Sequence, residues 1–578
     1  MRQETVNKKW ILPEVPDLSQ LQKQTGCSLM LTRLMYLRGF RTPQQMRDFL
    51  DPMHQRVPDA FLMKDMTKAV DRILQAIAQD EKIRVIGDYD QDGIASTAIL
   101  LTALRTLGAR ADFRIPHRVR EGYGIKPQHV ENAKADGVSL LITCDNGISA
   151  AEAARTAEAL SVDLLITDHH QPPEVLPEAV AILNPHQPDC PYPNKDLAGA
   201  GVCLKLSEAL WQKQYGTTRE MPPILYGFAA MGTVCDIMKL TGENRKITLT
   251  GLEALNRTKT AGLAALKEES GVRGLLDVYT LGFVIGPSMN AAGRLDTAEK
   301  AVRLLITDDP LEAVRLAKEL RQLNIRRQEM TEAAIEAVLP QIPDPVPPVL
   351  CLKTDCHESL LGIVAGKIRD RVHRPVYMMS EGAEPGMLKG SARSIASYPM
   401  HEKLKEVAEH LEQYGGHAMA AGFSVKEENA NAFCRALTAH WEPSEEDLLP
   451  TLRIDFPIDL SYINPVLVGE IERMAPFGKG NPKPLFASRD VTLAGIQVIG
   501  KNRQTLRFRF RRGRQEFTGI QFRRAEQTLE TLYTRFGRRF EQAFEQRGEG
   551  LTVQIVYTPQ MNEYAGSRFL QLVIEDIR

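Results

Sequence analysis

The chain has 578 residues, of which 43% are hydrophobic and 25% are charged, and its formal net charge is −1. These values are typical of folded globular domains and argue against a disordered chain. Because single cores rarely grow beyond about 250–300 residues, the length predicts several domains. A net charge near zero means that any contact with nucleic acid must come from local basic surfaces.

The cysteines and the apolar segments bear on cellular location. The eight cysteines include no CxxC pair, which favours reduced thiols over a zinc site or a disulfide framework. No apolar run approaches the roughly 18 residues of a membrane span, and the first residues do not have the pattern of a signal peptide. We therefore expect a cytoplasmic protein that does not associate with membranes.

Composition and periodicity divide the chain into five parts. Residues 1–45 carry no clear pattern and are expected to form an accessory segment. An α/β domain is expected at 46–310 and a connecting helix with a proline-rich linker at 311–348. A second α/β domain follows at 349–445. Residues 451–578 are rich in short strands and predict a β module of barrel size.

Strands and helices alternate in the first α/β domain, which predicts βαβ units and a mostly parallel sheet. Helices are expected at Ile94–Leu107 and Ala150–Leu160. The expected strands are Lys82–Asp88, Ala111–Pro116, Ser139–Asp145, Asp163–Thr167 and Ala179–Asn184.

Acidic and histidine side chains follow two of these strands. They are Asp88, Asp90 and Asp92 after the first strand, and Asp168, His169 and His170 after the fourth. Because open parallel sheets hold their active sites at the carboxyl ends of the strands, the two groups are expected at one edge. Such ligands suit Mg²⁺ or Mn²⁺, and this density of negative charge would be repulsive without a cation. The pattern predicts a metal-dependent hydrolase.

Two further aspartates end apolar segments: Asp145 ends the third strand, and Asp236 ends a helix-like run. A single aspartate in such a place is most often a cap or turn residue. Several of them around one sheet favour a metal site instead. Five or more ligands exceed the need of one ion that keeps water positions open, so two ions fit better. Ions about 3.5–4 Å apart can stabilise the attacking and leaving oxygens of a phosphoryl displacement.

The two adjacent histidines are expected to differ in role, because neighbours at a strand end point in different directions. One would bind metal, and the other would contact a substrate phosphate or orient a carboxylate. No Walker-type loop is present. The stretch Gly199-Ala-Gly201 is an incomplete match to a dinucleotide-binding motif and is more typical of a tight turn.

Several polar side chains lie in glycine-rich or strand-end stretches. They are Arg118, Arg294 within Asn290–Arg294, Arg393 within Lys389–Ser394, and His417 within Gly415–Gly422. Glycine lets the backbone approach a ligand, and a guanidinium group can bind phosphate through two hydrogen bonds. Taken alone, each stretch is equally well explained as a structural turn.

The segment Leu506–Arg512 alternates between apolar residues and arginine. In a strand this places Leu506, Phe508 and Phe510 on one face and Arg507, Arg509 and Arg511 on the other. We call these three arginines the arginine stripe. In a β module joined to a phosphoesterase, the stripe favours a track for a nucleic-acid backbone over a solvated outer face.

Taken together, these residues resemble the DHH phosphoesterase family, and within it the exonucleases specific for single-stranded DNA. The order and number of the matching stretches carry the resemblance, which runs from the region of residue 60 to the C-terminus. The stretches are Asp88–Gly93, Pro116–Gly124, Thr143–Ile148, Asp168–His170, Gly232–Asp236, Gly286–Leu295, Gly390–Ser394, Gly415–Gly422, Pro476–Pro482 and Gln571–Ile574.

The resemblance implies a parallel-sheet DHH domain, a long connecting helix, a DHHA1 α/β domain and a C-terminal OB-fold β-barrel. It implies two Mn²⁺ or Mg²⁺ ions. Their ligands would be Asp90, Asp92, Asp145, His169 and Asp236, with Asp88, Asp168 and His170 as catalytic neighbours.

The resemblance also implies a substrate and an activity. Its substrate-binding residues would be Arg118, Tyr123, Ser391 and Arg393 at the 5′ end of a strand, Arg294 at the phosphate that is cleaved, and Asn290 and His417. The expected activity is 5′-to-3′ hydrolysis of single-stranded DNA to mononucleotides, in DNA repair and recombination. A monomer that works with a helicase and a single-strand-binding protein is expected.

Three positions depart from the family pattern, namely Gln91, Ser288 and Cys356, and none removes an expected ligand. Two other functions remain open. One is hydrolysis of pyrophosphate, cyclic dinucleotides or very short oligonucleotides, against which the arginine stripe argues. The other is a catalytically inactive DNA-binding scaffold, against which the complete set of ligands argues.

Overall fold

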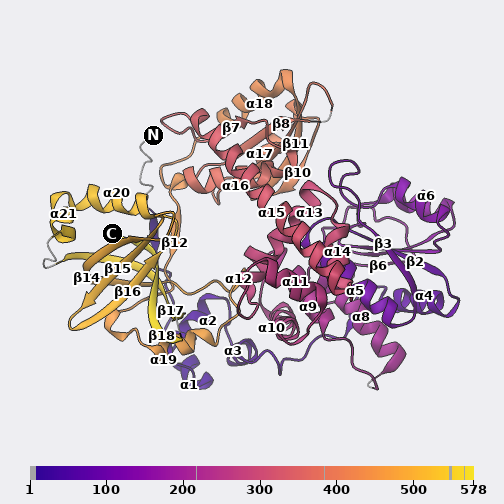
Figure 1. The fold of residues 1–578 in the computed structure, drawn as a ribbon, viewed down its shortest axis with the longest axis horizontal. Coiled ribbons are helices and arrows are strands. Elements are labelled where there is room, and N and C mark those ends of the chain that lie inside the picture. Colours follow the sequence, from indigo (N-terminus) through magenta and orange to yellow (C-terminus); the bar gives the residue numbers. More distant parts are fainter. Residues whose placement is uncertain (1–7, 217, 383, 546–549, 565) are drawn as a thin grey trace. The chain divides into compact units, whose positions relative to one another are not determined.

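The structure is a computed structural model that describes residues 8–216, 218–382, 384–545, 550–564 and 566–578. It comprises two compact units (Figure 1). Residues 55–448 form the first, which we call the two-sheet unit, and residues 1–54 and 449–578 form the second, the barrel unit. None of the described helices is long and apolar enough to cross a membrane.

The first sheet of the two-sheet unit is parallel throughout, with the order β3-β2-β4-β5-β6. Its strands are β2 (Lys82–Gly87), β3 (Arg110–Arg114), β4 (Leu140–Cys144), β5 (Asp163–Thr167) and β6 (Ala181–Leu183). Each strand lies within the range expected from the sequence or departs from it by one residue. The alternation of apolar and turn-forming segments was therefore sufficient to place this sheet.

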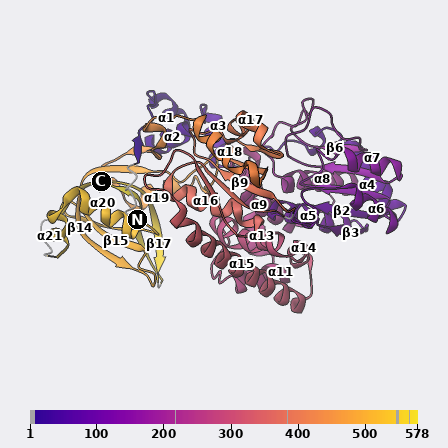
Figure 2. The ribbon, with the colours of Figure 1, turned by 90° about the horizontal axis from the view of Figure 1, so that it is seen from above.

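Helices cover both faces of this sheet (Figures 1 and 2). On one face, Ile83 and Val85 join a large core with helices from the rest of the domain. On the other, Ile86 packs with α6 and α7. The helices of the domain are α4 (Met66–Ala78), α5 (Gln91–Thr106), α6 (Pro127–Ala135), α7 (Ala151–Ala159), α8 (Gly199–Tyr215), α9 (Ile224–Cys235), α10 (Gly242–Arg257), α11 (Ala261–Glu269), α12 (Val278–Thr280), α13 (Gly286–Leu295) and α14 (Glu299–Ile306).

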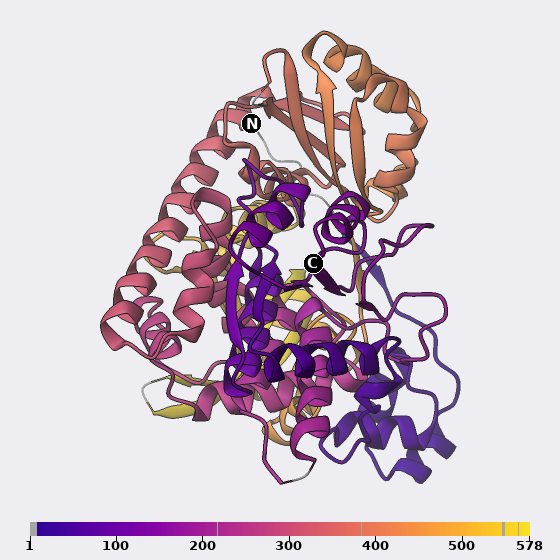
Figure 3. The ribbon, with the colours of Figure 1, turned by 90° about the vertical axis from the view of Figure 1, so that its right-hand side faces the viewer.

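A single long helix, α15 (Pro310–Val338), leads to the second sheet (Figure 3). Proline at its first turn and Asp309 as the capping residue begin it, which is the expected chemistry of a helix N-terminus. The sequence predicted one long, charged helix at Leu311–Leu339, and this is confirmed. Residues Ala334 and Val338 near its end pack into the core beneath the second sheet.

The second sheet has the order β10-β11-β9-β8-β7, with only β7 and β8 parallel. Helix α16 covers one face, and α17 and α18 cover the other. The elements are β7 (Leu350–Lys353), α16 (Leu361–Val372), β8 (Val376–Glu381), β9 (Met387–Arg393), α17 (Met400–Glu406), β10 (Gln413–His417), β11 (Ala420–Lys426) and α18 (Glu427–Ala439).

The barrel unit contains a six-stranded sheet, and the pairing of β14 with β17 closes this sheet into a barrel. Within β15, Leu506, Phe508 and Phe510 are at most 1% exposed, whereas the arginine stripe faces solvent. The predicted alternation is confirmed. The strands are β13 (Phe456–Pro457), β14 (Phe486–Ile499), β15 (Thr505–Arg512), β16 (Gln515–Gln521), β17 (Leu551–Tyr564) and β18 (Ser567–Ile577), with helices α19 (Pro465–Glu472), α20 (Ala525–Phe536) and α21 (Arg538–Glu545).

The N-terminal residues share the core of the barrel. Strand β1 (Lys9–Ile11) pairs with β12 (Thr451–Arg453). Helices α1 (Ser19–Thr25), α2 (Leu29–Leu37) and α3 (Pro43–Leu50) follow, and Leu31, Leu34 and Phe49 are buried against barrel residues. The segment that the sequence set apart as accessory thus packs with the C-terminal module. The finer domain limits of 46–310, 311–348 and 349–445 remain a prediction.

Candidate metal centre

The carboxyl edge of the first sheet and the ends of three helices bring the expected ligands together. Asp88 follows β2, and Asp90 caps α5 by accepting the amide N–H groups of Asp92 and Gly93. Asp145 follows β4, and Asp236 caps the C-terminus of α9. Asp168, His169 and His170 follow β5. The prediction that these side chains meet at one edge is confirmed.

Their ligand atoms form three groups, each within 4.8 Å. The groups are Asp88–Asp90–Asp145, Asp92–His169–Asp236 and Asp145–His169–His170. The first two share no residue, and the third joins them, because His169 Nε2 lies 3.1 Å from Asp145 Oδ1. His169 Nε2 also lies 3.7 Å from an oxygen of Asp92 and 3.7 Å from one of Asp236.

The donor set fits a hard divalent cation. Carboxylate oxygens with one or two imidazole nitrogens suit Mg²⁺ and Mn²⁺. Within the described residues, Asp88 Oδ1 and Asp145 Oδ1 are buried and accept no hydrogen bond. A buried carboxylate oxygen without a donor is costly, so these two atoms favour a bound cation.

Two glycines leave the space that the carboxylates occupy. A Cβ at Gly199 would lie 2.7 Å from Asp145 Cβ, and one at Gly232 would lie 2.3 Å from Asp92 Oδ1. Gly199 also begins α8, and the N–H groups of Gly199 and Ala200 donate to the Asp92 carboxylate at 2.7 and 2.9 Å. The expectation of a tight turn at Gly199-Ala-Gly201 is therefore wrong. This stretch is a helix N-terminus that binds a carboxylate, as such termini bind anions.

Three of the candidate ligands at this edge are buried, since Asp88, Asp92 and Asp145 are no more than 3% exposed. Burial, followed by repulsion between neighbouring carboxylates, raises the pKa of each of these three groups well above its ordinary value. Without a cation, the cluster would therefore hold protons that a bound metal ion would displace.

The two histidines have different surroundings, and their expected difference in role stays a prediction. Burial, with repulsion from His170, lowers the pKa of His169 to about 4, which leaves a neutral ring able to bind metal. His170 Nδ1 lies 2.8 Å from Asp168 Oδ1. Burial works against protonation of His170, but the hydrogen bond to Asp168 outweighs it and raises the pKa of His170 to about 9. Asp168 also accepts the backbone N–H groups of Ile148, His169 and His170, so it fixes the His170 ring and the backbone that carries both histidines.

The backbone beside Asp236 is strained. Ile237 has φ of 56°, a conformation that a β-branched residue rarely adopts. Strain of this kind persists where the surrounding structure holds it and is concentrated at functional sites.

Three arginines gather near the expected metal ligands. Arg118, Arg294 and Arg393 come from the loop after β3, from α13 and from β9, respectively. Burial, followed by repulsion from Arg118 and Arg327, lowers the pKa of Arg294 to about 10. Burial, with repulsion from Arg369 and Arg118, lowers the pKa of Arg393. Among the described residues, none of the three forms an ion pair with a carboxylate, so together they favour an anion.

The second sheet holds Arg393 in a row of side chains on one face. Arg393 lies opposite Ala420, which lies opposite His417, so His417 is two strands, or about 9.6 Å, away. Arg393 donates to Ser391 Oγ at 3.2 Å. A Cβ at Gly362 would lie 2.5 Å from the guanidinium, so this glycine in α16 makes room for it. The sequence identified Ser391, Arg393 and His417 but missed Gly362.

Three expected residues remain, namely Tyr123, Asn290 and Arg118. The Tyr123 hydroxyl donates to the backbone oxygen of Asp145 at 2.9 Å and lies 3.1 Å from His170 Nδ1. Asn290 is one helical turn before Arg294 on α13. Its Oδ1 is buried and has no hydrogen-bond partner in the described part of the chain. Arg118 lies over the Tyr89 ring, 4.7 Å from its centroid.

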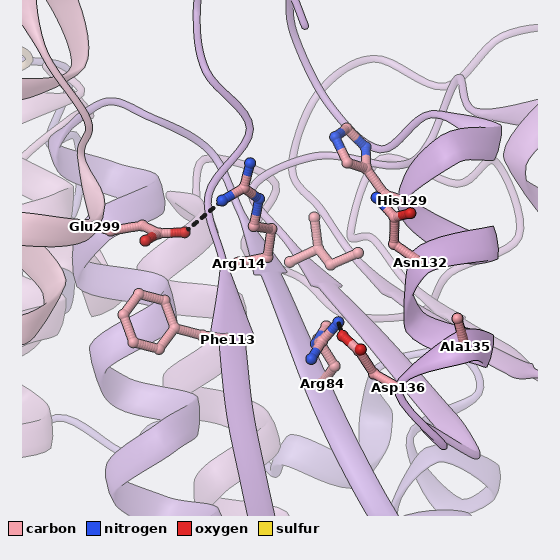
Figure 4. A pocket seen from close by; sticks show the side chains of 9 residues that line it. Arg84, Phe113, Arg114, His129, Asn132, Ala135, Asp136 and Glu299 are labelled. Atoms are coloured by element: carbon pink, nitrogen blue, oxygen red, sulfur yellow. Dashed lines mark hydrogen bonds and ion pairs between the residues drawn. The ribbon is translucent and has the colours of Figure 1, made fainter.

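A cavity of about 420 Å³ is lined by side chains of β2, β3 and α6 (Figure 4), and the loop between β3 and α6 carries Arg118 and Tyr123. Its charged walls are already paired: Arg84 with Asp136 at 2.8 Å and Arg114 with Glu299 at 3.1 Å. Buried His129, also in the wall, lies 3.0 Å from Glu121. Glu121 in turn accepts the N–H of His117. We infer that these pairs brace the loop.

Comparison with known families agrees with this geometry. The chain matches the DHH family N-terminal domain at residues 82–233, the DHHA1 domain at 347–441 and the RecJ OB domain at 454–576. A single-stranded-DNA-specific exonuclease RecJ of Escherichia coli is 33% identical, over 95% of each chain. The chain belongs to the RecJ family. The RecJ protein of Bacillus subtilis is 39% identical over 89% of this chain, which spans 65% of that relative.

Solved RecJ structures are also similar. The RecJ of Thermus thermophilus in complex with Mn²⁺ has a TM-score of 0.78 and 30% identity, and the similarity covers 99% of this chain and 79% of that one. A manganese-bound exonuclease RecJ has a TM-score of 0.58 and 34% identity, over 68% of this chain and 97% of that one. The expected DHH, DHHA1 and OB-fold architecture is thereby confirmed.

Divalent cations should stabilise this RecJ-family chain, and more so as the pH rises. The raised carboxyl pKa values mean that the folded, metal-free protein binds more protons than the unfolded chain. The stability of the metal-free protein therefore falls as the pH increases through the range of these raised pKa values. A metal at 100 times its Kd adds about 2.7 kcal/mol. Thermal unfolding with Mn²⁺ or with EDTA, between pH 5.5 and pH 8, measures the gain in stability that the metal gives. This gain should be smaller in Asp145→Asn. A gain independent of pH would contradict displacement of protons by the ion.

The substitution Gly199→Ala should disrupt the metal centre, because the new methyl group would overlap the Asp145 side chain. Loss of a supporting contact of this kind typically costs 10- to 100-fold in metal affinity or activity. Gly274→Ala is the matched control, since a Cβ there meets no atom within 4 Å. Titration with Mn²⁺, followed by thermal shift, compares the two variants. Equal affinities would show that the carboxylates adjust to the methyl group.

Proposed function

We propose that the chain is a 5′-to-3′ exonuclease that hydrolyses single-stranded DNA to mononucleotides with two divalent ions. The observation that carries this proposal is the pair of ligand groups that share no residue, Asp88–Asp90–Asp145 and Asp92–His169–Asp236. A single ion would need only one of these two ligand groups. The names of the RecJ relatives, single-stranded-DNA-specific exonucleases, supply the substrate class.

Each group would hold one ion, with Asp145 and His169 between them because these two residues lie 3.1 Å apart. Bound ions would activate a water molecule and stabilise the negative charge that develops on the phosphate oxygens. Asp92 is held by the N-terminus of α8 and Asp90 by the N-terminus of α5. Both carboxylates are therefore positioned before an ion arrives, which lowers the cost of assembling the site.

His170 and Asp168 would serve the substrate. Asp168 fixes His170 through Nδ1, which leaves Nε2 of a partly exposed ring directed away from Asp168. A positively charged imidazole beside the metal centre would bind a phosphate oxygen of the strand. Tyr123, which contacts His170 Nδ1 and the backbone of Asp145, would hold that ring against the site.

The arginine cluster would recognise the 5′ end. Three guanidinium groups without carboxylate partners suit a terminal phosphate, which carries more charge than an internal one. Arg393 and Ser391 would bind this phosphate, with Arg118, Asn290 and His417 nearby, and Arg294 would bind the phosphate that is cleaved. Binding of the end in this way limits cleavage to the adjacent bond, which makes the enzyme an exonuclease.

The barrel unit would bind the strand beyond the active site. Its exposed arginine stripe faces solvent on β15, and basic residues on a strand face bind phosphates without regard to sequence. We further propose that the enzyme acts as a cytoplasmic monomer in DNA repair and recombination. A helicase and a single-strand-binding protein would supply and present its substrate.

Strands labelled at one end test the proposal. With Mn²⁺, a 5′ label should appear at once as a mononucleotide, whereas a 3′ label should remain in a shortening strand. EDTA removes the ions, and Asp145→Asn weakens one of the two ligand groups, so each should suppress release at least about 100-fold. Early release of the 3′ label would reverse the direction. Cleavage of dinucleotides alone would indicate a hydrolase of short substrates, and binding without cleavage would indicate a scaffold.

The substitution Arg393→Ala should weaken the reaction on 5′-phosphorylated strands by about 1.5–3 kcal/mol, or roughly ten- to a hundred-fold, since one charged hydrogen bond is lost. Strands with a 5′ hydroxyl should lose less, because they lack the partner. Arg393→Lys keeps the charge without the planar fork and should restore only part of the loss. The measurement is kcat/KM on the two strands, and equal losses on both would show that Arg393 contacts an internal phosphate.

A further inference from the structure

Two aromatic side chains are exposed at the start of the helix that carries Asn290 and Arg294. Tyr279 is 59% exposed and Phe283 is 71% exposed. Their rings are stacked, with centroids 5.0 Å apart and planes at 22°. Exposed single apolar residues need no explanation, but a stacked aromatic pair in solvent presents a flat π surface of the kind that binds ligands.

The pair lies on an unusual piece of helix. Residues Val278–Thr280 form α12, Leu281–Ile285 form a π-helical turn, and Gly286–Leu295 form α13, without a break between them. A π-helical turn is uncommon and is frequently found at functional sites. Phe283 lies within this turn and Tyr279 directly precedes it.

Close contacts fix this helix on both sides of the metal centre. A Cβ at Gly286 would lie 2.6 Å from Cys235 Sγ, and Cys235 precedes the ligand Asp236. A Cβ at Gly293 would lie 2.2 Å from the backbone oxygen of Tyr89, which lies between Asp88 and Asp90. Seven residues separate these two contacts, or about 10 Å of helix. The helix therefore passes along the cluster of ligands.

The two ends of the helix consequently lie beyond opposite sides of the metal centre. Arg294 follows the contact with Tyr89, whereas Tyr279 and Phe283 precede the contact with Cys235. A strand held at its 5′ end by the arginines would pass the metal centre and continue toward the aromatic pair. We propose that Tyr279 and Phe283 form a base-stacking platform for the part of the strand on the 3′ side of the cleaved bond.

This inference rests on the proposed function and adds a source of specificity to it. Every base has a π face, so stacking tolerates any sequence. In a duplex the faces are already occupied by neighbouring base pairs, whereas a single strand can present them to an aromatic side chain. The platform would thus favour single strands at the metal centre itself, independently of the arginine stripe.

Three substitutions at Phe283 test the platform, since its exposure lets the fold tolerate them. Binding of a long oligothymidylate, measured by fluorescence anisotropy without divalent metal, should weaken about five- to a hundred-and-fifty-fold in Phe283→Ala. Phe283→Leu should weaken binding similarly, because it lacks a ring, and Phe283→Trp should retain it. Leu311→Ala, at a residue 82% exposed on α15, is the control for loss of an exposed apolar side chain. Thermal unfolding verifies that each variant is folded.

A strand that lacks bases beyond its first nucleotides completes the test. The wild-type protein should bind it more weakly than oligothymidylate, and Phe283→Ala should add no further loss. Wild-type affinity in Phe283→Leu would mean a general apolar contact, such as one with a protein, and would overturn the proposal. So would an equal loss in Phe283→Ala on both strands. Because these measurements contain no metal, they are independent of whether the wild-type protein degrades labelled strands.

Discussion

Repulsion between buried carboxylates is the constraint on which the rest of the two-sheet unit depends. Asp88, Asp92 and Asp145 are almost fully buried, and each would be costly to ionise beside the others. Groups at the sheet edge stabilise these carboxylates. Two helix N-termini bind Asp90 and Asp92, and His169 lies between Asp92, Asp145 and Asp236. The remaining unbalanced negative charge favours a bound divalent cation.

Burial and repulsion between like charges also act on the arginines, whose charge is positive. Arg294 and Arg393 are held by neutral groups, the backbone oxygen of Ser359 for one and the Ser391 hydroxyl for the other. Their charge is therefore left for a ligand. The two-sheet unit thus holds an acidic cluster that favours cations and a basic cluster that favours anions. Together they suit a phosphate ester bound to a metal ion. Neither cluster alone would distinguish a nucleic-acid end from a free ion.

Much of this arrangement followed from the sequence, and the exceptions have physical reasons. Strand ends could be located because apolar runs followed by acidic residues are local patterns. The role of Gly199 could not be predicted, because it depends on the contact between the start of α8 and Asp92, which is distant in sequence. Gln91 and Ser288 departed from the family pattern and both proved buried. Ser288 hydrogen-bonds to Asn324 of α15, whereas the Gln91 amide has no partner among the described side chains.

The aromatic pair shows why exposure cannot be inferred from hydrophobic periodicity. Tyr279 and Phe283 are four residues apart, a spacing that normally indicates the buried face of a helix. The π-helical turn changes the rotation per residue, and the close approaches at Gly286 and Gly293 fix which side of the helix faces the ligands. The helix thus packs these glycines against Cys235 and the Tyr89 backbone, which adjoin candidate ligands, and leaves its aromatic side chains in solvent. Gly286 and Gly293 let the helix approach the residues beside the candidate ligands. Tyr279 and Phe283 lie where the proposed strand would continue.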